Sequence, residues 1–260
     1  MSFLNILKKL LCPEAELLEE CDKDRKELSA KIVECEKIED GMEKDILRLN
    51  AQSIEFEKLI PLENPLEKRL NDKYPKVTIS YKGRTIPNFG SYELDVRNFF
   101  VNPESSELQK VVGKWKSLPD DEKAVECQKW VKKYIRYTSD KTQYGLEEFW
   151  GFPSETLKTK RGDCDNGCIL MGNLMLACDV PYWKVRMACG DVYDKNGKNL
   201  GGHAFLTYFV EKKNYWVAMD WCFNPDIRPV ESRPDYKESI LYGKGEVWFS
   251  FSKKYAYSVV

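Results

Sequence analysis

The chain has 260 residues, 42% of them hydrophobic and 13% aromatic, enough for one substantial domain with an extension or for two small domains. Its 41 basic and 42 acidic residues give a net charge of −1, which provides no electrostatic basis for binding nucleic acid or an anionic membrane surface. The balanced charge therefore leads us to expect no nucleic-acid partner. No run of 18 apolar residues occurs, so we also expect no membrane span.

The cysteine content indicates a reducing compartment. The nine cysteines form no C-x-x-C pair and no regular framework, which is typical of free thiols rather than of a disulfide scaffold. The opening stretch MSFLNILKKLLCPEAELLEE has no long apolar run and no small-residue cleavage site, so it does not resemble a signal peptide. We therefore expect the protein to be cytoplasmic.

The first predicted element is a long helix. Residues 14–60 are rich in Glu, Lys, Leu and Ile and contain no proline. Apolar residues recur there every seven positions, at Cys21, Leu28, Cys35, Met42, Leu49 and Phe56. A seven-residue repeat is typical of a coiled coil, so we expect residues 1–60 to form a helical or coiled-coil region that could pair two copies of the chain as a homodimer. The alternative is a long helix that lies along the globular domain.

Residues 61–103 form the predicted linker. Three prolines in LIPLENPLEKRLNDKYPK end the long helix near residue 60. The segment KVTISYKGRTIPNF then alternates in hydrophobicity like a short hairpin, with Lys82 and Gly83 at its turn.

The third part, residues 104–260, carries helices first and strands afterwards. Two helices are expected before residue 138, broken at LPDD, where Asp120 or Asp121 can cap the second. The stretch TSDKTQYGLEEFWGFPSETL is loop-like and aromatic, and the segments YWKVRMACGDV, HAFLTYFV, YWVAMDWCF and GEVWFSFSKKYAYSV have strand patterns. This order predicts an α+β domain rather than alternating βαβ units.

Cys164 lies at a distinctive place in this domain. The residues that follow Asp163 predict a helix with one apolar stripe, made of Cys164, Cys168, Met171, Met175 and Cys178. Asp163 stands where an N-cap belongs, so Cys164 falls in the first helical turn. Unpaired N–H groups and the helix dipole at that position favour a thiolate and lower its pKa.

A thiolate nucleophile needs a base, and the chain contains a single histidine, His203. The segment HAFLTYFVEKKNYWVAMDW reads as two strands joined by a turn. A turn with an even number of residues pairs Val210 with Tyr215 and places His203 and Asp220 on one face as diagonal neighbours. Asp220 can then hold one imidazole nitrogen and leave the other for Cys164. An odd-numbered turn would separate the two side chains.

Three motifs follow one another in this order: FPSETLKTKRGDCDNGCILMGNLMLACDVPYWKVRM, GGHAFLTYF and YWVAMDW. With them, residues 145–225 resemble the transglutaminase-like cysteine peptidases, in particular the bacterial branch. The resemblance implies a papain-like core in which a helix with the cysteine packs on an antiparallel sheet with the histidine and aspartate. It implies Cys164 as nucleophile, His203 as base and acid, and Asp220 as the residue that orients the imidazole.

The resemblance also bears on cofactors. Some relatives bind calcium through the acids that flank the cysteine, which correspond to Asp163 and Asp165 here. Bacterial relatives usually read Cys-Glu-Asp at a position where this chain reads Cys164-Asp165-Asn166. No cofactor is required by the expected chemistry, and calcium stays open.

The expected function is acyl transfer on protein or peptide amides, with peptide-bond hydrolysis first. One alternative is a transglutaminase or deamidase that acts on glutamine side chains, because both chemistries begin with the same acyl-enzyme. Another is a catalytically silent coiled-coil assembly protein. Zinc held by Cys164, Cys168, His203 and Cys222 is a third, although C-x3-C is an unusual spacing for zinc. The aromatic residue Trp150 is expected either in a substrate cleft or in the core.

Overall fold

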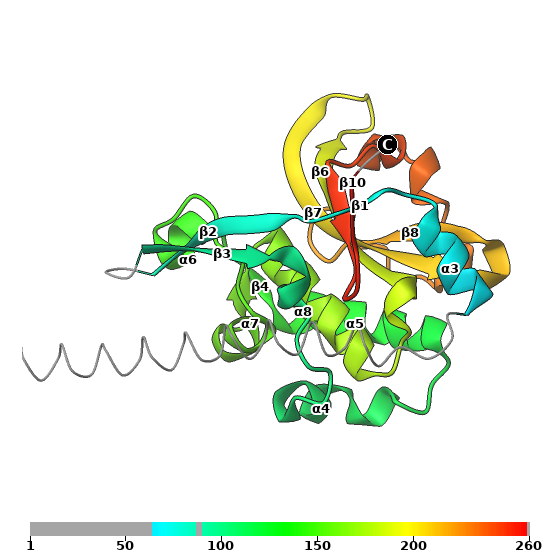
Figure 1. Cartoon of the computed structure of the whole chain (residues 1–260), viewed down its shortest axis with the longest axis horizontal. Helices are drawn as coiled ribbons and strands as arrows, with labels where there is room; N and C mark the ends of the chain where they lie inside the picture. The colour runs from blue at the N-terminus through cyan, green and yellow to red at the C-terminus, as the bar shows by residue number, and fades with distance from the viewer. Residues whose placement is uncertain (1–63, 87–89, 259–260) are drawn as a thin grey trace, which may run out of the picture. The chain divides into compact units, whose positions relative to one another are not determined.

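A six-stranded antiparallel sheet forms the centre of the fold in the computed structural model, which describes residues 64–86 and 90–258 (Figure 1). The strand order is β1-β10-β9-β6-β7-β8, so the long strands β6 and β7 lie in the interior. The bounds are β1 Lys76–Val77, β6 Val185–Tyr193, β7 Asn199–Val210, β8 Tyr215–Met219, β9 Phe249–Phe251 and β10 Ala256–Ser258.

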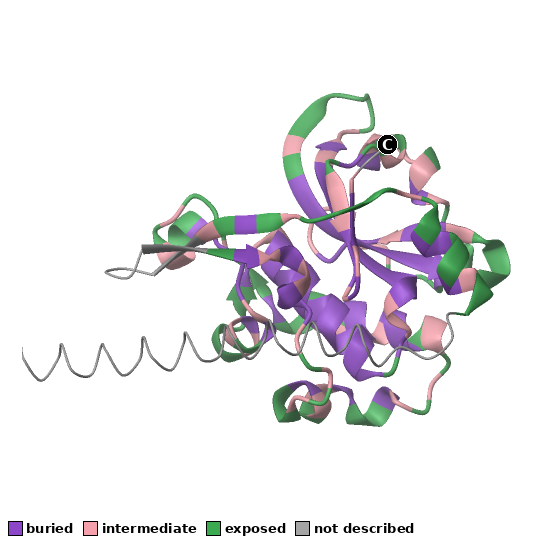
Figure 2. Ribbon diagram, viewed as in Figure 1, coloured by how far each residue is buried: buried purple, intermediate pink, exposed green. Residues whose placement is uncertain are grey.

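Helices gather on one face of this sheet (Figure 1). Their bounds are α4 Ser106–Val112, α5 Asp120–Tyr134, α7 Pro153–Thr159 and α8 Cys164–Ala177, and the short helix α3 Pro65–Asp72 lies near strand β8. α8 packs between the sheet and α4, α5 and α7, and every residue from Asp165 to Ala177 is buried (Figure 2). The predicted apolar stripe is therefore one part of a helix that is buried on all sides.

The opposite face of the sheet is covered by residues 235–247, which we call the covering segment. It contains the 3-10 helices η6 Tyr236–Glu238 and η7 Ile240–Gly245, whereas the preceding 3-10 helix η5 Val230–Ser232 contacts α5. Alternate residues of β7 contact the two layers. Tyr208 donates a hydrogen bond to Asp121 of α5, whereas Phe205 packs its ring against Tyr242 of η7 with centroids 4.6 Å apart.

The helix and strand predictions for residues 104–260 are largely confirmed, with two corrections. The N-cap of α5 is Pro119, and Asp120 and Asp121 lie in the first helical turn instead of capping it. The aromatic stretch after residue 137 was expected to be a loop, but it contains α6 Asp140–Tyr144 and the helix α7. Both are short helices without a repeating apolar face, which explains why the pattern did not reveal them.

The predicted hairpin exists, but its turn lies elsewhere. β2 Ser80–Ile86 pairs with β3 Gly90–Asp95, so Lys82 and Gly83 are inside a strand. The register shifts between Tyr81 and Arg84, which makes Gly83 part of a bulge. A Cβ at Gly83 would lie 2.2 Å from the hydroxyl oxygen of Tyr81, so the glycine marks a close approach rather than a turn.

Two further features complete the described part of the chain. β4 Arg136–Tyr137 pairs in parallel with β5 Arg161–Gly162 immediately before Cys164. The 3-10 helices η1 Val96–Phe99, η2 Gly113–Trp115, η3 Tyr182–Lys184 and η4 Glu211–Lys213 connect the main elements. None of the helices in residues 64–86 and 90–258 is both long and apolar enough to cross a membrane. The predicted coiled coil of residues 1–60 lies outside the described residues.

Candidate functional site

His203 and Asp220 meet at one end of the strand pair β7–β8. Val210 pairs with Tyr215 and Leu206 with Met219, so the turn at residues 211–214 is even-numbered and the predicted register is confirmed. Nε2 of His203 lies 2.9 Å from Oδ2 of Asp220. The remaining ring nitrogen, Nδ1, is therefore the one available for a third group.

The Asp220 carboxylate is held by several donors. Its Oδ1 accepts the backbone N–H groups of Cys222 and Phe223, at 3.0 and 3.1 Å, and its Oδ2 also accepts the hydroxyl of Tyr242 at 3.3 Å. Burial alone would raise the pKa of Asp220, but the hydrogen bond and charge of His203 together with the backbone donors hold it below its usual value. Asp220 is thus kept as an anion beside the imidazole.

Cys164 begins helix α8, as predicted, with Asp163 at the N-cap. The backbone N–H of Ala204, the residue that follows His203, is near enough to the Cys164 thiol to act on it and lower its pKa. On the other side, the indole of Trp221 donates to the Cys164 carbonyl oxygen at 3.1 Å. A Cβ at Gly167 would lie 2.1 Å from that indole, so the glycine lets Trp221 pack against the first turns of α8.

The pKa of the Cys164 thiol differs from the expectation. Helix position alone predicts a lowered pKa, yet burial raises it, and the charges of Asp165 and Asp163 raise it further. Desolvation and two adjacent carboxylates outweigh the lowering effect of the Ala204 N–H on this pKa. This arrangement of charges therefore disfavours the thiolate.

Four carboxylates lie around the start of α8: Asp140, Glu148, Asp163 and Asp165. One ligand atom each from Asp140, Glu148 and Asp165 lies within 4.8 Å of the other two, and the same holds for Asp163, Cys164 and Asp165. Burial and the charge of Asp163 raise the pKa of Asp140 to about 7. Burial, Asp163 and Glu148 raise the pKa of Asp165 well above its usual value.

Asn166 ties this acidic cluster to helix α8. Its side-chain amide is fully buried and donates to Asp140, at 3.3 Å, and to Asp163, at 3.1 Å. It also donates to the carbonyl of Phe149 and accepts the backbone N–H of Gly151. One amide side chain therefore fixes the positions of two acids from different segments.

The cluster suits a hard divalent cation. Asp165 is 3% exposed, and its Oδ1 has no hydrogen-bond partner among the described residues. An orphaned carboxylate oxygen among three other carboxylates is costly without a cation, and oxygen donors are the ligands that calcium takes. The residues present therefore fit calcium, with Asp140, Glu148, Asp163 and Asp165 as candidate ligands.

The four residues proposed as zinc ligands do not gather into one site. Cys222 lies with His203 and Asp220, and Cys164 lies with Asp163 and Asp165, in separate groups of potential ligands among the described residues. Cys168 is in neither group; its thiol is fully buried and donates to the Ala204 carbonyl at 3.2 Å. The zinc alternative is thereby not supported.

Trp150 belongs to the core rather than to a cleft. Its ring stacks on Tyr81 with centroids 5.0 Å apart, and it lies close to Phe99 and Phe251. Its indole N–H donates to Glu148 at 2.6 Å. Trp150 therefore contributes to the site indirectly, by holding one member of the acidic cluster.

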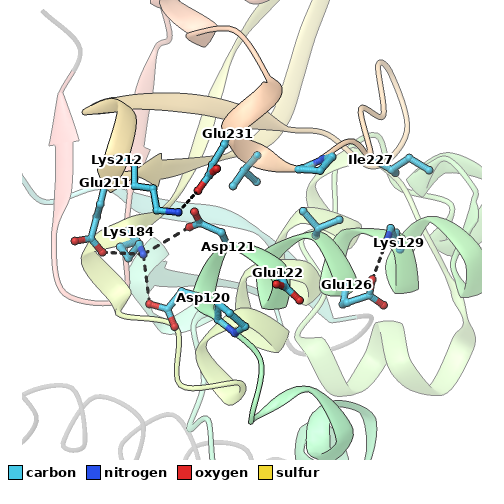
Figure 3. Close-up of a pocket in the computed structure, with 14 residues that line it drawn as sticks. Asp120, Asp121, Glu122, Glu126, Lys129, Lys184, Glu211, Lys212, Ile227 and Glu231 are labelled. Atoms are coloured by element: carbon cyan, nitrogen blue, oxygen red, sulfur yellow. Dashed lines mark hydrogen bonds and ion pairs between the residues drawn. The ribbon is translucent and has the colours of Figure 1, made fainter.

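A pocket of about 790 Å³ lies away from the residues described above, between α5, the β7–β8 turn and residues 227–231 (Figure 3). Its polar wall is an ion-pair network in which Lys184 contacts Asp120, Asp121 and Glu211. The lining contains no histidine and no cysteine. We assign the network to stability and not to the reaction.

Sequence patterns missed several residues of the site. Asp140 and Glu148 lie in a stretch without helical or strand periodicity, and the only signal was its acidic content beside aromatics. Tyr242 lies in a segment of 3-10 turns and had no signal. Trp221 was part of the YWVAMDW motif, but its contact with Cys164 depends on the fold.

Part of the chain matches the model of a known protein family. Residues 109–221, an interval that includes Cys164, His203 and Asp220, match the model of the transglutaminase-like superfamily. No curated protein sequence matches the chain.

Three solved structures of Legionella pneumophila LapG are similar to this chain. The calcium-bound structure has 16% identity and a TM-score of 0.44, covering 58% of this chain and 76% of that chain. A second structure has 17% identity and a TM-score of 0.44, covering 58% and 74%. The EGTA-treated structure has 16% identity and a TM-score of 0.45, covering 77% and 88%.

Proposed function

The chain carries a domain of the transglutaminase-like superfamily, and on that premise we propose that it is a cysteine-dependent acyl-transfer enzyme that hydrolyses peptide bonds. The observation that carries the proposal is the hydrogen bond between His203 and Asp220, which leaves Nδ1 of the imidazole free. Cys164 lies at the N-terminus of α8, with its thiol beside the residue that follows His203.

The proposed reaction gives each of the three side chains its own role. His203 takes the proton of the Cys164 thiol, and the sulfur attacks the amide carbonyl to form a tetrahedral intermediate. The imidazolium gives its proton to the leaving amine, so the C–N bond breaks, the amine departs neutral and the acyl-enzyme remains. Water, activated by the neutral imidazole, then releases the acid and restores the thiol. Asp220 orients the imidazole and stabilises its positive charge.

The acidic cluster adds a requirement to this proposal. The pKa of Cys164 is raised by burial and by Asp165 and Asp163, which opposes the first proton transfer. We propose that Asp140, Glu148, Asp163 and Asp165 hold a calcium ion, whose positive charge would offset the repulsion that these carboxylates exert on the thiolate. The unpartnered Oδ1 of Asp165 supports this assignment.

The principal alternative shares the first half of the reaction. If a lysine amine in place of water resolved the acyl-enzyme of a glutamine side chain, the product would be an isopeptide link. If water resolved the same intermediate, the glutamine would be deamidated. Cys164, His203 and Asp220 would have the same roles in all three reactions.

The test compares the products formed in a cell lysate by the wild-type chain and by Cys164→Ala, in calcium and in chelator. New peptide termini that depend on Cys164 would support a peptidase, whereas new isopeptide links or glutamate in place of glutamine would support the alternatives. Cys168→Ala is the matched control, because Cys168 lies one helical turn further along α8 and is fully buried. Identical products from wild type and Cys164→Ala would contradict the proposal and favour a catalytically silent assembly protein.

A further inference from the structure

A small cavity of about 50 Å³ lies between the sheet and the covering segment, on the face opposite α8. Arg186 in β6 and Thr207 in β7 are directly paired and form its floor, and Tyr236 and Lys237 of η6 contribute from above. The complete lining is Tyr74, Arg186, Ala188, Thr207, Trp216, Tyr236, Lys237, Gly245, Val247, Ser250 and Ser258. It shares no residue with the candidate active site.

Arg186 is a buried cation without a carboxylate partner among the described residues. It is 3% exposed, and its guanidinium carbon lies 4.0 Å from the ring centre of Tyr257 and 4.7 Å from that of Trp216. One Nη donates to the carbonyl of Leu70 at 2.8 Å, but Nε has no hydrogen-bond partner in the described part of the chain. Aromatic faces and one carbonyl leave most of the desolvated positive charge unneutralised.

The rest of the lining is also suited to a negative charge. Lys237 adds a second cation, whose ammonium donates to the hydroxyl of Tyr74. The side chains of Thr207, Ser250 and Ser258 bring hydroxyl groups, and none of the eleven lining residues is acidic. Asp235, two residues before Lys237, is acidic, but its carboxylate accepts the backbone N–H of Lys237 and does not line the cavity.

We propose that this cavity is a binding site for a small inorganic monovalent anion of chloride size. A cavity needs about 10–15 Å³ to hold one water molecule. The volume of about 50 Å³ therefore admits a halide or nitrate ion with part of its hydration shell but no organic carboxylate. The anion would accept the unpartnered Nε–H of Arg186 and neutralise the guanidinium charge. In doing so it would bind the covering segment to the sheet at a point distant from Cys164.

Thermal unfolding of the full chain in sodium chloride and in sodium gluconate, at matched ionic strength, tests the proposal. Chloride should raise the melting temperature along a saturable curve that gluconate does not reproduce, because gluconate is too large to enter. In crystals grown with bromide, an anomalous peak should lie beside Nε of Arg186. Equal melting curves in the two salts, or bromide peaks elsewhere only, would overturn the proposal.

Two variants separate this site from general salt effects. Arg186→Met should abolish the chloride-specific increase, and Ser250→Asp should abolish it as well while raising the melting temperature in gluconate, because it supplies an internal counter-ion. Arg233→Met is the matched control, since Arg233 is also a buried arginine but lies outside the cavity. A chloride-specific increase that persisted in both Arg186→Met and Ser250→Asp would overturn the proposal.

Discussion

The hydroxyl of Tyr242 donates to the same carboxylate oxygen of Asp220 that binds His203. Tyr242 comes from the covering segment, so the orientation of the Asp220–His203 pair depends on a part of the chain outside the strands that carry them. We predict that Tyr242→Phe lowers kcat by roughly tenfold, since loss of one hydrogen bond to a charged group costs about 1.5 kcal/mol. It should leave KM nearly unchanged.

The same substitution should also shift the pH profile. Without the Tyr242 hydroxyl, the Asp220 carboxylate attracts the imidazolium more strongly, so the acid limb of the kcat/KM profile should move to higher pH. Tyr236→Phe is the control, because this ring also packs on Phe205 but does not contact Asp220. An unchanged acid limb in Tyr242→Phe would show that Tyr242 serves packing alone.

We predict strong non-additivity between the nucleophile and the base. Cys164→Ala and His203→Ala should each reduce turnover to background, and the double variant should do no further harm, because both changes remove the same step. Asp220→Asn should retain more activity than either, because the imidazole remains in place. Turnover is measured on the amide substrate that the lysate screen identifies. Near wild-type turnover of His203→Ala would rule out the mechanism.

Asp165 should make the stability of the protein depend on pH and on calcium. The pKa of this carboxyl is raised on folding, so its contribution to stability is greatest below its unfolded pKa and is lost as the pH rises through the folded value. In chelator, the melting temperature should therefore fall between pH 4 and pH 7. Asp140, whose pKa is raised to about 7, also lowers stability as the pH rises through this range. Asp220, whose pKa is lowered, instead loses its contribution to stability as the pH falls, below this range.

The matching variant is Asp165→Asn. In chelator at pH 7 it should stabilise the fold by on the order of 2 kcal/mol, because it removes a carboxyl group whose ionised form is disfavoured by burial while keeping the shape of the side chain. It should also weaken the stabilisation that calcium gives to the wild type, as measured by thermal unfolding across a calcium titration. Equal responses of wild type and variant to calcium would exclude Asp165 as a ligand.

Among the residues that line the pocket of Figure 3, Lys184 is predicted to be the one whose substitution destabilises the fold most. Its side chain is 4% exposed, and its ammonium lies 2.9 Å from Glu211, 3.3 Å from Asp120 and 3.9 Å from Asp121. Lys184→Met would leave these carboxylates without a central cation and should cost about 3 kcal/mol in denaturant unfolding. Lys212→Met, which breaks an exposed pair with Glu231, should change stability little. Similar losses in both variants would contradict a special role for the buried ammonium.

The seven-residue repeat predicts self-association. Light scattering should give the mass of a dimer for the full chain and of a monomer for a chain that begins at residue 62, because the repeat lies in residues 14–60. If both have the mass of a monomer, the long helix does not pair two copies of the chain.

Local patterns predicted the features that depend on neighbours in the sequence. The apolar residues behind Cys164 predicted its position at the start of a helix, and Asp163 occupies the N-cap position there without a side-chain capping hydrogen bond. The shared face of His203 and Asp220 follows from alternation and an even turn, because a strand has a side-chain period of two. Both are short-range consequences of backbone geometry.

Properties that depend on distant segments were missed or reversed. The helix start alone suggested a lowered pKa for Cys164, but the outcome is set by burial and by the carboxylates around it. Lys82 and Gly83 resembled a turn, but the glycine accommodates the Tyr81 side chain within a bulged strand. A short stretch of sequence shows neither how deeply Cys164 is buried nor that the Tyr81 side chain lies against Gly83. Neither the raised pKa nor the bulged strand could therefore be predicted from it.

The pairing of β1 with β10 has a consequence for biosynthesis. Lys76 lies opposite Tyr257 and Val77 opposite Ala256, so β1 must wait for a segment roughly 180 residues later in the sequence before it can pair. The strands β6, β7 and β8 can pair as they emerge, because short connections join them. Until β9 and β10 are made, however, the outer edge of β6 remains unpaired and β1 has no partner. The nascent chain therefore exposes the edge of β6 from the time this strand emerges until β9 is made, and this is the period in which chaperones would protect it from aggregation.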